Sequence, residues 1–104
     1  MAVLVLDSRS TAEILLAGEL DLDTAAVLEP VVTDILIDPQ VQRIVIDGAM
    51  TTFCDSSGLS ALVRAQHHAR NFNVPLHLVR PSLRLSRILA ATGLWQTLVG
   101  PAFE

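Results

Sequence analysis

Two serines and a carboxylate stand side by side in the segment TTFCDSSGLSALV, which spans residues 51–63. Asp55, Ser56, Ser57 and Gly58 lie where an apolar run gives way to a helical pattern of apolar residues. Hydroxyl and carboxyl groups at such a junction can cap a helix, attack a substrate or accept a phosphate group. The types and spacing of these side chains therefore leave three chemistries open.

Helix capping follows from position alone. A strand pattern ends before the segment and Leu59 begins a helical face, so the acid and the serines fall at a loop-to-helix junction. Ser56 or Ser57 would then lie near the N-cap, where a serine accepts a hydrogen bond from a free backbone N–H and contributes about 1 kcal/mol. The charge of Asp55 is also favoured at the positive end of the helix dipole. Local physics favours this interpretation.

A catalytic serine is disfavoured because the groups it needs are missing. A hydrolase serine requires a base, an orienting acid and an oxyanion hole, and the strained elbow G-x-S-x-G is absent. The histidines are His67, His68 and His77. On a helix that starts near the serines, His67 lies roughly 15 Å along the axis. We therefore expect no enzymatic activity.

Neither a metal nor a cofactor is expected. The chain has one cysteine, Cys54, which follows an apolar approach and is interpreted as a small buried side chain. No zinc-ligand spacing is present, and no glycine-rich loop of the kind that cradles a nucleotide phosphate.

A phosphate group on a serine is the third chemistry. Free N–H groups and the helix dipole stabilise an anion at a helix N-terminus. Phosphorylation would add roughly −1.5 to −2 charges next to Asp55. The local surface would become strongly anionic, and a partner that docks there would sense the change as a switch. Local physics permits this chemistry but does not require it.

The rest of the sequence predicts the elements that position this segment. The predicted strands are residues 2–6, 13–18, 41–47 and 75–79, and the predicted helices are residues 23–38, 59–69 and 82–93. The final WQTLVG is a short strand or a closing apolar tail. The order β-β-α-β-α-β-α predicts an α/β fold with a small mixed, mainly parallel sheet of about four to five strands and three to four helices.

Composition narrows the class of protein. The 104 residues suit a single domain, residues 1–104, and 51% of them are hydrophobic. No apolar run reaches the roughly 18 residues of a membrane span, and the start lacks the pattern of a signal peptide. The net charge of −4 comes without a basic footprint, so direct nucleic-acid binding is not expected. We expect a cytoplasmic domain that does not insert into a membrane.

Three segments carry a resemblance to a known family. FCDSSGLSAL, residues 53–62, resembles the signature of anti-sigma factor antagonists, the stand-alone members of the STAS domain superfamily. LAGELDLDTA, residues 16–25, resembles their G-x-L-D stretch with its following Asp and Thr. RIVIDGAMTTFCDSSGL, residues 43–59, agrees with the strand and loop that precede the signature. The order of elements matches over nearly the whole chain.

The resemblance implies a function and a site. Family members bind an anti-sigma factor, commonly a serine kinase, and thereby free a sigma factor; the kinase phosphorylates a serine of D-S-S-G, and a serine phosphatase reverses this. The matching acceptor here is Ser57. The resemblance also implies a partner-binding surface made of Asp21, Asp23, Thr24, Asp55, Ser56, Ser57, Gly58 and Leu59.

Two other functions stay open. A STAS module can serve a different complex, such as a transporter-associated assembly or a stress-signalling scaffold, in which phosphorylation would matter less. Nucleotide binding or hydrolysis is a role sometimes proposed for STAS domains. We disfavour it here because the sequence shows no phosphate-cradling loop.

Overall fold

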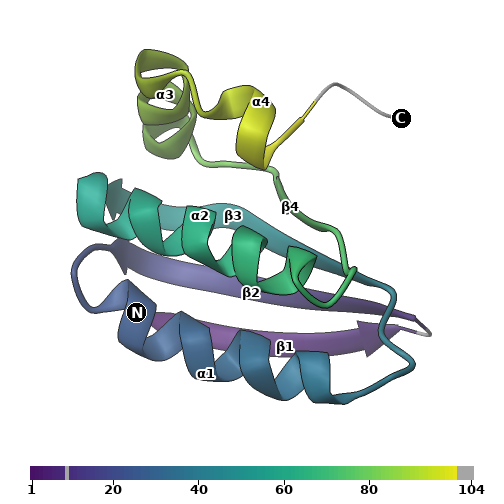
Figure 1. The fold of residues 1–104 in the computed structure, drawn as a ribbon. Coiled ribbons are helices and arrows are strands. Elements are labelled where there is room, and N and C mark those ends of the chain that lie inside the picture. The colour runs from purple at the N-terminus through teal and green to yellow at the C-terminus, as the bar shows by residue number, and fades with distance from the viewer. Residues whose placement is uncertain (9, 101–104) are drawn as a thin grey trace.

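The computed structural model describes residues 1–8 and 10–100 and contains one mixed sheet. Its strands are β1 (Ala2–Ser8), β2 (Thr11–Leu20), β3 (Arg43–Cys54) and β4 (Leu76–Val79), in the spatial order β1-β2-β3-β4 (Figure 1). β1 and β2 form an antiparallel hairpin, whereas β3 pairs parallel with both β2 and β4. The predicted α/β class and mainly parallel sheet are confirmed. Residues 9 and 101–104 of the predicted domain lie outside the described residues.

The helices are α1 (Thr24–Ile37), α2 (Ser56–Arg70), α3 (Leu83–Thr92) and α4 (Trp95–Leu98). α1 and α2 lie side by side on one face of the sheet (Figure 1). α3 and α4 lie near the edge of the sheet that β4 forms, where α3 contacts β3 and α4 contacts β4 (Figure 1). Alternate strand residues point at α1 and α2, because side chains on a strand change face at every residue. The buried core includes Ala12, Ile14, Leu16, Ile44, Ile46, Leu76 and Leu78 from the sheet, with Leu28, Val32, Leu62, Ala65 and Ala69 from the helices.

β3 is longer than predicted. The sequence predicts a strand over residues 41–47 and a loop over residues 48–52. The prediction of the loop is wrong. β3 continues to Cys54 and pairs with β2 as far as Leu20. The pairing shifts register twice, between Leu15 and Ala17 and between Gly18 and Glu19, and Gly18 has a φ of +106°. These bulges break the alternation of apolar residues by which a strand is recognised.

α3 agrees with the helix predicted over residues 82–93, and the segment that follows it differs from the prediction. Ser82 caps α3 by accepting a hydrogen bond from the N–H of Leu85 at 3.2 Å. Gly93 ends α3 in the left-handed conformation with a φ of +75°. The final WQTLVG segment, predicted as a strand or tail, instead contains the short helix α4. α1 includes Pro30 within its length.

A buried carboxylate joins the middle of β3 to the segment between β4 and α3. The side chain of Asp47 is 3% exposed, accepts a hydrogen bond from the N–H of Ala49 at 2.9 Å and is paired with the guanidinium of Arg80. Arg80 has a φ of +48°, which a non-glycine residue rarely adopts, and also approaches Glu13. Burial alone would raise the pKa of Asp47. The hydrogen bonds from Arg80 and Ala49 and the positive charge of Arg80 outweigh burial, so its pKa lies below the ordinary 3.8.

The lowered pKa of Asp47 predicts a pH-dependent contribution to stability. A carboxylate with a depressed folded-state pKa stabilises the fold above its unfolded pKa and loses that contribution as the pH falls through the folded value. We expect Asp47→Asn to be less stable than the wild type near neutral pH. The difference should shrink as the pH drops below 3.8. Urea unfolding of both proteins across this range measures it, and a pH-independent difference would contradict the assignment.

Candidate functional site

The N-terminus of α2 begins directly after β3. Asp55 is the single residue between Cys54 and Ser56, and its backbone is extended, with φ −113° and ψ −176°. Its carboxylate accepts a hydrogen bond from the N–H of Gly58 at 2.9 Å. Asp55 is therefore the N-cap, and the prediction of a capping Ser56 or Ser57 is wrong. β3 ends at Cys54 and α2 begins at Ser56, so the N-cap position between the two elements falls on Asp55.

The two serines lie in the first turn of α2 without a capping role. Ser56 is exposed and Ser57 is half-buried. Among residues 1–8 and 10–100, neither hydroxyl takes part in a hydrogen bond. The N–H of Leu59 donates to the carbonyl of Asp55 at 3.0 Å, so regular helix bonding begins just beyond the serines. Both hydroxyls are consequently available for chemistry.

Gly58 brings the two motif segments into contact. A Cβ atom on Gly58 would lie 2.2 Å from the carbonyl oxygen of Leu20 and 2.3 Å from its carbonyl carbon. The same carbonyl accepts a hydrogen bond from the N–H of Asp55 at 3.1 Å. Only a residue without a side chain permits so close an approach between the start of α2 and the end of β2. The G-E-L-D and D-S-S-G segments therefore form one structural unit.

The loop after β2 is held by its own polar side chains. The N–H of Asp21 donates to the Thr24 hydroxyl at 2.7 Å, and the N–H of Asp23 donates to the Asp21 carboxylate at 3.1 Å. Thr24 is 1% exposed, whereas Asp23 is exposed and Asp21 is half-buried. Thr24 therefore shapes the loop, and the two acids contribute to its surface.

The predicted site residues divide into two groups. Asp21, Asp23, Asp55, Ser56 and Ser57 gather at the carboxyl end of the parallel strands and are at least partly accessible. The other three, Thr24, Gly58 and Leu59, are buried and act as support for that surface.

Sequence reasoning missed two apolar residues at this site. Leu22 is 77% exposed, and it lies between Asp21 and Asp23 in the loop. Phe53 is 43% exposed and lies two residues before Asp55. Exposed apolar side chains rimmed by polar residues contribute to a protein-binding surface where they form a contiguous patch. The signal for Leu22 was a lone leucine between two aspartates, but its exposure depends on the packing of α1.

The electrostatic character of the site is negative. The ion pairs among the described residues are Arg64–Glu29, Arg80–Glu13 and Arg80–Asp47, so none of them neutralises the site acids Asp21, Asp23 or Asp55. An added phosphate would increase the negative charge of this surface.

Cys54 does not add a reactive thiol to the site. Burial, assisted by the charge of Asp55, raises the pKa of Cys54 to about 11. The thiol is therefore protonated near neutral pH, and a protonated thiol is a poor nucleophile. Cys54 was predicted to be a small buried side chain, and it is half-buried and packs against the core.

The adjacent histidines His67 and His68 lie in the last turn of α2, whereas the serines lie in its first turn. His67 is exposed, and the His68 ring lies 3.3 Å from the Thr33 hydroxyl and contacts Phe72 edge-on. Within the part of the chain that the structure covers, no three His, Cys, Asp or Glu side chains are grouped to hold a metal ion. None of the helices described is long and apolar enough to cross a bilayer.

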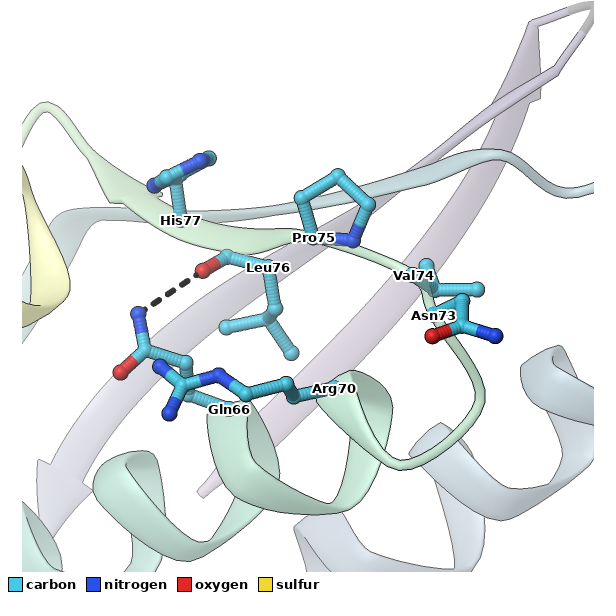
Figure 2. Close-up of a pocket in the computed structure, with 7 residues that line it drawn as sticks. All are labelled: Gln66, Arg70, Asn73, Val74, Pro75, Leu76 and His77. Atoms are coloured by element: carbon cyan, nitrogen blue, oxygen red, sulfur yellow. Dashed lines mark hydrogen bonds between the residues drawn. The ribbon is translucent and has the colours of Figure 1, made fainter.

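A separate pocket of about 260 Å³ lies at the other end of α2 (Figure 2). Gln66 on α2 is 5% exposed there. Its side-chain N–H groups donate to the carbonyls of Leu76 at 3.1 Å and Thr97 at 2.6 Å. The amide therefore ties α2 to β4 and α4, and this pocket contains none of the predicted site residues.

Comparison with known proteins agrees with this architecture. The family model described as "Mlab, STAS domain" matches residues 5–100. An anti-sigma factor antagonist from Mycobacterium paratuberculosis is 25% identical with a TM-score of 0.78, and the match covers 98% of this chain and 86% of that one. No curated protein sequence gives a match.

More distant structures share the fold. The anti-sigma factor antagonist SpoIIAA in its unphosphorylated form is 20% identical with a TM-score of 0.76, covering 97% of this chain and 89% of that one. The Bacillus SpoIIAA in the phosphorylated form is 20% identical with a TM-score of 0.70, covering 97% and 92%. The murine anion transporter Slc26a9 is 14% identical with a TM-score of 0.75, covering 94% of this chain but 17% of the transporter.

The close approach at Gly58 predicts a large effect of a single methyl group. Gly58→Ala places its Cβ against the backbone of Leu20, which cannot rotate away, so we expect a loss of about 3 kcal/mol in the free energy of unfolding. Ser60→Ala, at an exposed position of the same helix, is the control and should change stability by less than about 0.5 kcal/mol. Similar unfolding curves for the two variants would show that the contact is easily relieved.

With Asp55 as the N-cap, substitutions at Asp55 and at Ser57 should have different effects on stability. Asp55→Ala removes the acceptor for the Gly58 N–H and should cost about 1 kcal/mol of stability. Ser57→Ala removes a hydroxyl without a hydrogen-bond partner and should stay within about 0.5 kcal/mol of the wild type. Chemical denaturation of both variants measures the difference, and the reverse order would return the cap to the serine.

Proposed function

Because the chain belongs to the STAS domain family, we propose that it is a cytoplasmic anti-sigma factor antagonist controlled by phosphorylation of Ser57. In its unphosphorylated form it binds an anti-sigma factor of the serine kinase type, and this binding releases the sigma factor. The observation that carries the proposal is the first turn of α2. There Asp55 satisfies the cap, so the Ser57 hydroxyl is left without a structural role.

The site suits a substrate of a kinase. In the transfer, the Ser57 oxygen bonds to the γ-phosphorus of ATP, the bond from that phosphorus to ADP breaks, and the serine proton passes to a base of the kinase. Ser57 needs only to be reachable, and it is half-buried at the edge of the domain. Free N–H groups at the start of α2 favour the added phosphate.

Charge explains how the phosphate would end binding. Asp21, Asp23 and Asp55 carry no ion pair among the residues that the structure describes, so a partner surface that binds them should be basic. Exposed Leu22 and Phe53 should contact apolar groups of that surface. The phosphate adds roughly −1.5 to −2 charges and a hydrated group at the centre of the contact. The complex then dissociates, and a serine phosphatase restores binding.

A second function has its own support. The matching family model carries the name Mlab, and the transporter Slc26a9 contains a similar fold. A STAS module of a transport complex would use the same surface to hold a partner permanently. In that case a charge at Ser57 would affect assembly only as an ordinary surface change.

Substitutions at Ser57 distinguish the two functions. Ser57→Ala should bind the anti-sigma kinase like the unphosphorylated wild type and stay bound in the presence of ATP. Ser57→Asp should bind at least about tenfold more weakly, which corresponds to about 1.4 kcal/mol. Calorimetric titration with the candidate kinase measures both affinities.

Intact-mass analysis and peptide mapping after incubation with kinase and ATP locate the phosphate. Ser56→Ala is the matched control and should still gain one phosphate, whereas Ser57→Ala should gain none. If Ser57→Asp and Ser57→Ala both bind like the wild type, the switch is excluded and the permanent module is favoured.

A further inference from the structure

A groove lies between α1 and the edge strand β1, at the end of the sheet away from Ser57. Its volume is about 290 Å³. Val5, Val31, Ile35 and Val41 form an apolar floor, and three aspartates, Asp7, Asp34 and Asp38, line it as well. β1 and the C-terminal half of α1 border this end of the molecule, whereas the start of α2 lies at the opposite end (Figure 1).

The described residues that line the groove carry charge of one sign. They include no arginine or histidine, and the three aspartates are absent from the ion pairs among the described residues. Asp34 and Asp38 are one helical turn apart on α1, and Asp7 approaches from β1. A cationic occupant is therefore complementary to the groove.

The position of these acids is unfavourable for the free domain. Asp34 lies in the last turn of α1 and Asp38 is its C-cap, where the helix dipole is negative and cations are favoured. The last turn contains no basic residue. Local stability would select the opposite charge at this end, so an occupant that supplies positive charge would relieve the repulsion.

Apolar surface accompanies the charge. Val5 is 38% exposed at the groove, and Ile37, next to Asp38, is 73% exposed. A small hydrated cation would leave this surface in contact with water. The occupant that satisfies both features carries apolar side chains between basic ones.

We propose that this groove docks a basic amphipathic peptide segment of a protein partner. Arginine or lysine side chains of the segment pair with Asp7, Asp34 and Asp38, and an apolar side chain rests on Val5 and Ile35. The site is independent of the proposed phosphorylation, because the start of α2 stays accessible when the groove is filled. The domain can then hold two partners at once, one at each end of its sheet.

Fluorescence anisotropy with a labelled peptide of repeated Arg-Leu-Leu-Arg units tests the proposal. The wild type should bind this peptide, and the double variant Asp34→Asn with Asp38→Asn should bind at least about tenfold more weakly. The asparagine at position 38 can still accept the hydrogen bond from the N–H of Gln40. The control is Glu19→Gln with Glu29→Gln, which makes the same change of net charge outside the groove and should alter binding by less than about twofold.

Further measurements separate the alternatives. Addition of the peptide should move the amide chemical shifts of residues 5–7 and 34–41. The double variant Asp34→Asn with Asp38→Asn should melt no lower than the wild type, since it loses unfavourable charge at the end of α1. Asp7→Asn, on the other wall, should weaken binding independently. Equal affinity for an oligoarginine peptide without leucine would overturn the proposal, as would shifts confined to α2. Self-association of the free domain through β1 and α1, seen by sedimentation, would also overturn it.

Discussion

The approach of Gly58 to the carbonyl of Leu20 is the contact on which the geometry of the site depends. It seats the first turn of α2 against the end of β2, with a gap too small for any side chain on Gly58. Asp55 is held by the same carbonyl through its N–H. The acidic loop that follows Leu20 is thereby placed beside the serines. The D-S-S-G segment, which resembles a phosphorylation motif, thus also packs α2 against β2. Asp55 and Gly58 serve the packing, and the serines are the candidates for modification.

This division explains how a serine can be modified without harm to the fold. The carboxylate of Asp55 accepts the N–H of Gly58 in the first turn of the helix, so neither serine hydroxyl is needed as the cap. Thr24 performs the corresponding task in the neighbouring loop, where its buried hydroxyl accepts the N–H of Asp21. Structural polar groups lie inward and reactive or charged groups lie outward. The exposed surface can therefore change its charge while the scaffold below stays constant.

Charge is also distributed unevenly over the rest of the molecule. Asp47 and Arg80 form a compensated pair that joins β3 to the segment between β4 and α3. The acids beside Ser57 and those between α1 and β1 have no such compensation among the described residues. Uncompensated acids next to exposed apolar side chains lower the stability of an isolated domain and favour association. The two ends of the sheet are therefore the surfaces at which we propose binding, whereas the middle is a packed scaffold.

The sequence by itself determined those features that depend on neighbours along the chain. The hairpin, most of α2, the Ser82 cap and the end of α3 at Gly93 were all predictable, because their signals are local. The two motif segments also indicated the family, which the family model confirms, and they predict Ser57 as the phosphate acceptor.

Tertiary structure alone decided the rest. The extension of β3 through residues 48–54 depends on bulged pairing with β2, a segment more than thirty residues away along the chain. That extension moves the end of the strand to Cys54 and makes Asp55, not a serine, the N-cap. The burial of Thr24 and the exposure of Leu22 likewise follow from how α1 packs on the sheet. A local pattern can predict that a helix cap or an exposed loop is present. Contacts between distant segments determine which residue is the cap and which side chains are exposed.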